Sequence, residues 1–322
     1  MRKTTLVLLI AAAAFIVVGL VVFCVGMMLM NWDFTKLSTA EYFTNEYEIT
    51  EDYDNISVSV DTADVIFLPS ESGITKVSCY EKEIEKHSVK VVNGTLTVNV
   101  ESNNKKWYQY ISFNGSSAKV TVYLPKAEYE ALVLRGGTGR LELPNTLSFK
   151  SIDASLSTGD AICNSSADEL VKIKTSTGSV LVDGISTSKL DVSVSTGRVS
   201  LSNVNCGGEV NVRLSSGDVN LKTVRCASLN ARGTTGDIRF DDVVASDAFN
   251  LKVSTGDVTM LNCDAGEIFV TTGTGDVNAT LLSDKVYITN TSTGKINVPS
   301  SISGGRCEIT TTTGDIKITV KQ

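Results

Sequence analysis

The chain contains 322 residues and carries a formal net charge of -7 at pH 7, with a pI near 5.0. Nucleic-acid-binding domains are usually basic, so this balance argues against nucleic acid as a partner. Only four prolines and 7% aromatic residues are present. That composition fits stacked strands of small β-branched side chains better than a broad globular core.

The first expected element, residues 1–30, is an apolar membrane anchor. Leu6 to Met30 is 25 residues long without a charged side chain, and as a helix it would extend about 37 Å, enough to span a bilayer with some tilt. Arg2 and Lys3 precede it, and the next basic residue is Lys36. The positive-inside rule therefore predicts a cytoplasmic N-terminus and an extracytoplasmic remainder. No small-x-small cleavage site follows this long apolar run, so we expect an anchor and not a cleaved signal peptide.

Residues 31–43 are a predicted linker, and residues 44–130 form a predicted irregular β cap with the first coils of a repeat. Ile56–Val60 and Leu96–Val100 alternate as strands do, and Asn93-Gly94 predicts a hairpin turn. The single histidine, His87, follows a charged segment and is expected on a solvated strand or turn. One aromatic group is expected in an exposed loop, either packing over the open end of the repeat or binding sugars or proteins: Trp107, Tyr108, Tyr110 and Phe113.

Residues 131–322 are a predicted run of regular repeats with a corner glycine in each. These glycines recur every 19 or 20 residues, and each follows Ser or Thr. A fixed short period indicates one supersecondary unit stacked on copies of itself. We expect each glycine at a tight corner with positive φ. They are Gly139, Gly159, Gly178, Gly197, Gly217, Gly236, Gly256, Gly275, Gly294 and Gly314.

Apolar residues flank each corner glycine at strand spacing. They lie two and four residues after it, as in Val219 and Leu221, and seven and five residues before it, as in Val210 and Val212. One coil cannot bury these pairs, whereas a stacked neighbour can. The sequence therefore predicts an all-β fold, a single-stranded parallel β-solenoid of about ten coils and roughly 48 Å in length, preceded by one transmembrane helix.

The C-terminal coils are less regular. Before Gly294, the expected inward residues are Tyr287 and Thr289, whereas Val286 and Ile288 look like better core residues. We interpret this as a one-residue bulge or register shift. The final strand, residues 316–320, is expected at the open end, where Lys317 and Lys321 would discourage edge pairing.

The leading strand Asn55–Val60, the segment Val120–Pro125 and the serial Ser/Thr-Gly-Asp-Val corners resemble one bacterial family. It is a family of domains of unknown function known as "putative adhesin", and the likeness covers roughly residues 40–322. The resemblance implies a right-handed β-helical fold, an envelope location and a link with envelope-stress regulation. It implies no catalytic residue, because the shared motifs are structural corners.

Two charged columns are candidate sites. An acidic column follows the corner glycines, and its stacked carboxylates could bind a divalent cation or serve as turn residues. A basic column lies four residues before the glycines and is either a set of exposed ion pairs with the acidic column or a strip for an anionic wall polymer. The acidic column is Asp218, Asp237, Asp257 and Asp276, and the basic one is Lys174, Arg213, Arg232 and Lys252, of which the last three lie in consecutive coils.

Seven cysteines are present, and one pair could form a disulfide. Cys206 and Cys226 hold the same place in adjacent coils, about 5 Å apart by strand spacing. Cys163, Cys263 and Cys307 fall on inward positions, where they act as small hydrophobes.

The sequence favours a non-catalytic function. With one histidine there is no Ser-His-Asp triad, and no zinc or phosphate-loop motif is found. We expect a membrane-anchored, adhesin-like surface protein that presents its polar solenoid to cell-wall glycopolymers or envelope proteins, with no cofactor. An alternative is an envelope-stress regulatory or scaffold module acting through a membrane partner. A glycan-active enzyme is a more remote alternative.

Overall fold

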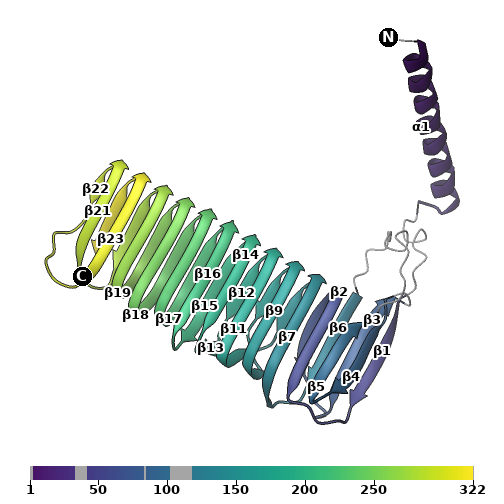
Figure 1. Ribbon diagram of the computed structural model, residues 1–322, viewed down its shortest axis with the longest axis horizontal. Helices are drawn as coiled ribbons and strands as arrows, with labels where there is room; N and C mark the ends of the chain where they lie inside the picture. The colour runs from purple at the N-terminus through teal and green to yellow at the C-terminus, as the bar shows by residue number, and fades with distance from the viewer. Residues whose placement is uncertain (1–2, 33–41, 83–84, 102–117, 322) are drawn as a thin grey trace.

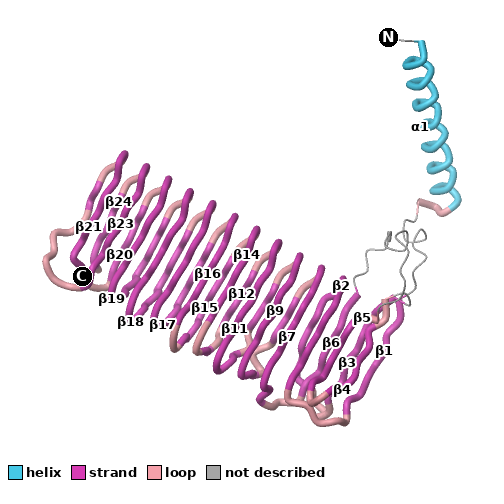
Figure 2. Tube along the Cα trace, viewed as in Figure 1, coloured by secondary structure: helices cyan, strands magenta, loops and turns pink. Residues whose placement is uncertain are grey.

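The computed structural model describes residues 3–32, 42–82, 85–101 and 118–321. It consists of one helix, α1, and a parallel β-solenoid in which every strand belongs to one 24-stranded sheet that winds around a common core (Figures 1 and 2). The predicted all-β solenoid of about ten coils, with one apolar helix before it, is confirmed.

Helix α1 spans Lys3–Leu29 and is apolar on all sides. An 18-residue window within Thr5–Leu29 has a mean hydropathy of 3.2, and none of that window is buried within the protein. In length and composition it meets the requirement for crossing a bilayer. Figure 1 shows α1 standing apart from the stacked strands.

An irregular cap lies at the N-terminal end of the solenoid. Strand β3 pairs antiparallel with β1 and β6, while β4 and β5 form a hairpin. The predicted turn at Asn93-Gly94 is confirmed, with φ of 50° and 71° as a type I′ turn requires. The aromatic group of residues 107–113 lies outside the described residues. The cap strands are β1 (Tyr42–Ile49), β3 (Thr75–Lys82), β4 (His87–Val92), β5 (Thr95–Val100) and β6 (Ala118–Leu124).

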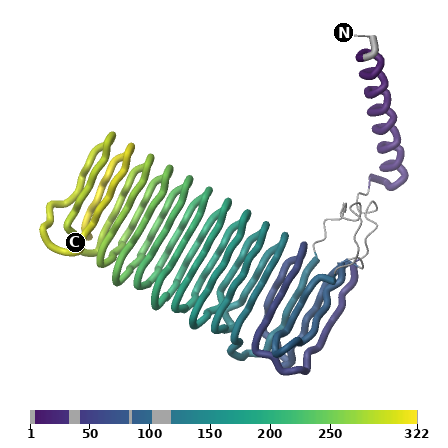
Figure 3. The backbone as a smooth tube through the Cα atoms, in the orientation of Figure 1, coloured from purple at the N-terminus to yellow at the C-terminus, as the bar shows by residue number. Residues whose placement is uncertain are grey.

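The first coil is β2 (Asn55–Pro69), and the regular coils stack on it in parallel (Figure 3). The two halves of β2 pair with β5 and β6 on the cap side and with β7 and β8 on the other. The next strands are β7 (Glu128–Thr138), β8 (Leu141–Leu143), β9 (Ser148–Thr158), β10 (Ala161–Cys163), β11 (Ser166–Thr177), β12 (Val180–Asp183), β13 (Ser186–Thr187), β14 (Leu190–Thr196), β15 (Val199–Cys206), β16 (Glu209–Ser216), β17 (Val219–Thr235), β18 (Ile238–Thr255), β19 (Val258–Thr274) and β20 (Val277–Leu281).

The predicted apolar spine is confirmed as one continuous core from Ile49 to Ile318. Val210 and Val212 are fully buried, and Val219 and Leu221 are buried nearly as well. Their side chains are fixed in register with equivalent residues of the neighbouring coils, because each rung pairs with the next at the same position of the repeat. The core is therefore a stack of aliphatic layers, and each coil buries its apolar pairs only against its neighbours.

The corner glycines have the predicted positive φ, between 125° and 155°. A second corner, six residues after the glycine, also adopts the left-handed conformation and was not predicted. Its occupants in five successive coils are Gly184, Asn203, Thr223, Asp242 and Asn262, with φ from 51° to 67°. Gly, Asn and Asp tolerate this conformation well, whereas the β-branched Thr223 is strained there.

The last two coils are stacked in reverse chain order. They are built from β21 (Lys285–Thr293) and β22 (Ile296–Asn297), and from β23 (Gly305–Thr313) and β24 (Ile316–Val320). Strand β23 pairs with β19 on one side and β21 on the other, and β24 lies in the same way between β20 and β22. The chain thus leaves one rung open after β20, forms the outermost coil, and returns to fill the gap (Figure 1).

This order overturns two predictions about the C-terminal end. The bulge expected before Gly294 is absent from β21, because Tyr287 and Thr289 stay in register with Cys307 and Ile309. Val286 and Ile288 instead face solvent, at 38% and 48% exposure. The inward positions can be polar because this coil has a neighbour on one side only.

The second correction concerns the edge of the sheet. The final strand, β24, pairs with β20 along its whole length and with β22 at Ile316 and Lys317, so Lys317 does not protect an open edge. The outermost strands at this end are β21 and β22, which come earlier in the chain.

Candidate functional site

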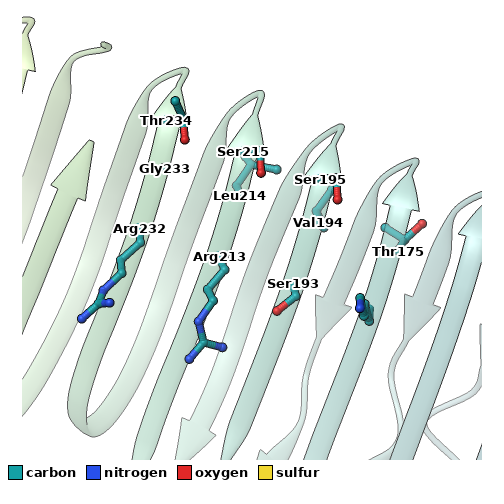
Figure 4. Close-up of a pocket in the computed structure, with 11 residues that line it drawn as sticks. Thr175, Ser193, Val194, Ser195, Arg213, Leu214, Ser215, Arg232, Gly233 and Thr234 are labelled. Carbon is teal, nitrogen blue, oxygen red and sulfur yellow. The ribbon is translucent and has the colours of Figure 1, made fainter. Parts of the chain in front are cut away.

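The basic column forms a straight row across five parallel strands. Lys174, Ser193, Arg213, Arg232 and Lys252 are direct register partners from β11 to β18. Adjacent members are therefore about 4.8 Å apart along the solenoid axis. The four basic side chains are exposed, and Figure 4 shows those of Arg213 and Arg232 side by side, extending the same way along their strands.

A groove of about 320 Å³ runs beside this basic row from Lys174 to Arg232, and Lys252 continues the row beyond the residues that line the groove. On its other side lie the hydroxyl groups of Ser195, Ser215 and Thr234, two residues further along each strand. Side chains at alternate strand positions point outward, so the residues between the two rows, Val194, Leu214 and Gly233, lie at the groove floor, and the first two are buried. The groove therefore offers cations along one wall and hydrogen-bonding hydroxyls along the other.

Most cations of this row have no carboxylate partner. Arg213 Nη1 lies 3.0 Å from Asp191 Oδ1, a carboxylate of the preceding coil and not of the acidic column. Within the described ranges, Lys174, Arg232 and Lys252 form no ion pair. The row is thus a local excess of positive charge on an acidic protein.

An asparagine ladder borders the basic row on its far side. Asn230 Nδ2 donates to Asn211 Oδ1 at 2.9 Å, and Asn250 Nδ2 donates to Asn230 Oδ1 at 3.0 Å. These residues lie two positions before Arg213, Arg232 and Lys252, in the same three coils. The repeat spacing alone could have identified them, since each precedes its corner glycine by six residues. The ladder fixes the outer surface on which the cations stand.

The acidic column is a ladder of hydrogen bonds between side-chain carboxylates and main-chain N–H groups. Each carboxylate accepts the backbone N–H of the equivalent residue in the adjacent coil through its Oδ1, at 2.7–3.1 Å. The same contact also occurs outside the predicted column, where Asp64 in β2 accepts the Arg140 N–H at 2.9 Å and Asp160 accepts the Ser179 N–H at 2.8 Å. Binding of a divalent cation by Asp218, Asp237, Asp257 and Asp276 stays a prediction beside the alternative that they serve as turn residues.

Cys206 and Cys226 are free thiols in the structure, and both are buried. Burial raises the pKa of both thiols, that of Cys226 to about 12. Neither is therefore a thiolate at neutral pH, which makes both slow to react. Cys163, Cys263 and Cys307 lie fully inside the core, as predicted.

The prediction that His87 is solvated is wrong. His87 is 2% exposed, and Glu81 beside it is fully buried. Glu81 is buried because it lies on the inward face of β3, the same face as Val77 and Cys79. The irregular cap gave no repeat with which to recognise this.

These features define the class of the protein: a parallel β-solenoid with an apolar N-terminal helix, whose surface is organised into straight polar rows. The chain belongs to the Toastrack DUF4097 family, whose model matches residues 53–241 and 223–322. A search among curated proteins finds no match.

Several solved structures are similar to this chain. A protein from Parabacteroides distasonis, described as a "putative lipid binding protein", is 13% identical, with a TM-score of 0.33, and covers 87% of this chain and 98% of its own. A "putative adhesin" from Bacteroides fragilis is 14% identical, with a TM-score of 0.31, and covers 86% and 97%. A "putative cell adhesion protein" from Clostridium sporogenes is 12% identical, with a TM-score of 0.27, and covers 87% and 100%. Such distant likenesses say nothing about what this chain binds.

Proposed function

We propose that this protein is a non-catalytic surface protein that binds an anionic polymer of the cell wall, such as a teichoic acid. In this proposal α1 anchors the chain in the cell membrane, with its N-terminus in the cytoplasm and the solenoid outside. The basic row of Lys174, Arg213, Arg232 and Lys252 binds the polymer along the solenoid axis. The adjoining hydroxyl row hydrogen-bonds to its sugars or polyols.

One observation carries the proposal: unpaired cations stand in register in one row, and the row borders a groove from Lys174 to Arg232. A cation with a carboxylate neighbour is already neutralised, whereas Arg232, Lys174 and Lys252 keep their charge for an external anion. Guanidinium groups also bind phosphate oxygens in a bidentate manner. A polymer with regularly spaced phosphates or carboxylates can contact several of these cations at once, and linked contacts strengthen one another through effective concentration.

The test is charge reversal at three positions: Arg213→Glu, Arg232→Glu and Lys252→Glu. Binding of the full chain in detergent to purified wall polymer is measured by calorimetry. Three exposed charge contacts of about 0.5 kcal/mol each predict a loss of affinity of about tenfold or more. The matched control, with Lys119→Glu, Lys222→Glu and Lys317→Glu, changes the net charge equally at exposed positions outside the groove and should bind nearly as well as the native chain.

Two outcomes contradict the proposal. If the groove variant binds the polymer as well as the control variant does, the row is not the binding surface. If crosslinking in cells captures a membrane protein and no wall polymer, the regulatory or scaffold function replaces polymer binding.

A further inference from the structure

A polar cluster interrupts the apolar core at the N-terminal cap. Strand β3 turns alternate residues inward, and two of these, Cys79 and Glu81, are fully buried. His87, at the start of β4, is buried beside them. Burying ionisable groups in a core is unfavourable unless each is paired or binds a metal.

Both carboxylate oxygens of Glu81 accept hydrogen bonds from neighbouring donors. Its Oε1 accepts from Asn45 Nδ2 at 2.6 Å. Its Oε2 accepts the main-chain N–H of His87 at 2.7 Å and lies 2.6 Å from His87 Nδ1. The Tyr47 hydroxyl donates to the His87 carbonyl oxygen at 3.2 Å. The imidazole is thus held in a fixed orientation through Nδ1 and its own main chain.

The other side of the imidazole is unsatisfied. His87 Nε2 is buried and has no hydrogen-bond partner among the described residues. Ligating atoms of Cys79, Glu81 and His87 all lie within 4.8 Å of one another. Two ligands of one zinc ion are roughly 3.5 Å apart, given bonds of about 2.3 Å to sulfur and about 2.0 Å to nitrogen. The cluster is within about 1.3 Å of this spacing, so metal binding requires the side chains to move closer together.

We propose that the cap binds a thiophilic metal ion, Zn²⁺ or Cu⁺, with the Cys79 thiolate and the His87 imidazole as ligands and Glu81 as the residue that orients the imidazole. A carboxylate that binds one imidazole nitrogen while the other binds metal is the usual arrangement around metal-bound histidine. Thiolate and imidazole together favour zinc and copper over hard ions such as Ca²⁺ or Mg²⁺. The Cys79 proton leaves to solvent when the metal binds.

The proposed metal would link two strands of the cap, β3 and β4. Cys79 and Glu81 belong to β3 and His87 to β4, so a metal would join the two arms of the cap, one pairing toward β6 and the other toward β5. Because the residues are buried, we expect the metal to enter as the cap folds and to be retained afterwards.

The experiment uses the full chain without an affinity tag, produced in medium supplemented with zinc or, under reducing conditions, with copper. Elemental analysis after removal of free metal should find one ion per chain for one of the two metals. Cys79→Val and His87→Phe should each lose it, whereas Cys163→Val, which removes another fully buried thiol, should retain it. Retention of neither metal by the native chain overturns the proposal, as does retention by Cys79→Val.

X-ray absorption of the native metal-loaded chain decides the matter even if the cap variants do not fold. The sequence contains one histidine, so imidazole scattering around the metal can come only from His87. A ligand shell with one sulfur and an imidazole supports the site. A shell that lacks the sulfur, or one that lacks the imidazole, contradicts it.

Discussion

Gly256 illustrates why the regular coils of this solenoid need glycine at their main corner, whereas the first coil, β2, has Ala63 at the equivalent position. Its φ is 147°, and a Cβ built on it would lie 2.0 Å from the carbonyl oxygen of Gly236 in the preceding coil. Consecutive corners therefore touch through their main chains, and a side chain would have to push two coils apart. Both the backbone conformation and the lack of space exclude other residues.

Replacing this corner glycine should be far more damaging than replacing a glycine elsewhere in the same coils. We expect Gly256→Ala to lower the free energy of unfolding by more than about 2 kcal/mol, since the positive φ alone costs about 1–2 kcal/mol before the clash is counted. The control is Gly233→Ala, where φ is not in the left-handed region and a Cβ would make ordinary contacts of 3.5 and 3.6 Å. That variant should be neutral or slightly stabilising. Urea unfolding of both variants checks this, and equal losses would contradict it.

The residues that could be predicted from sequence are those that obey the repeat. The position of Arg213 and Arg232 in one row follows from the sequence, because a fixed period converts sequence spacing directly into spatial stacking. The buried pair of Glu81 and His87 lies in the irregular cap, where a charged segment gave no sign of which residues face inward. Local pattern fails there because the fold of the cap depends on antiparallel partners distant in the chain.

At the scale of elements, the reversed order of the last two coils has an energetic consequence. The inner coil, β23 and β24, buries Ile309, Ile316 and Ile318 between two neighbours. The outer coil, β21 and β22, leaves Val286, Ile288 and Ile296 exposed at 38–48%. The polar residues Tyr287 and Thr289 at inward positions of the outer coil indicate that this coil is unusual, but strand period alone cannot reveal in which order coils stack.

Two deletions distinguish the reversed order from simple sequential stacking. Removing residues 305–322 takes away the inner coil, and loss of its three buried isoleucines should destabilise the protein by roughly 3 kcal/mol or more. Removing residues 285–304 instead takes away only the outer coil and connects β20 to β23, so the effect should be clearly smaller. Chemical unfolding measures both. If the first deletion proves milder than the second, the coils stack in chain order and the outer position of β21 is wrong.

At the scale of the whole molecule, coils of nearly equal length align equivalent residues of successive coils on the surface. Corners recur every 19 or 20 residues, so a residue type repeated at one position becomes a straight row parallel to the axis. The hydroxyl, basic and asparagine rows stand side by side for this reason. An extended ligand can therefore meet the same chemistry at several successive rungs, which suits a repeating polymer better than a compact small molecule.

The length of the basic row sets a testable limit on such a ligand. From Lys174 to Lys252 there are four rung spacings, or about 19 Å at 4.8 Å each. Affinity for size-fractionated anionic wall polymer should therefore rise with the length of the polymer until it spans about 19 Å. For longer polymers, the affinity per binding site should change little. Added salt should weaken binding at every length, because exposed charges are screened over about 8 Å at physiological ionic strength. Calorimetry across a length and salt series measures both dependences, and an affinity indifferent to polymer length would mean that the cations do not act as one row.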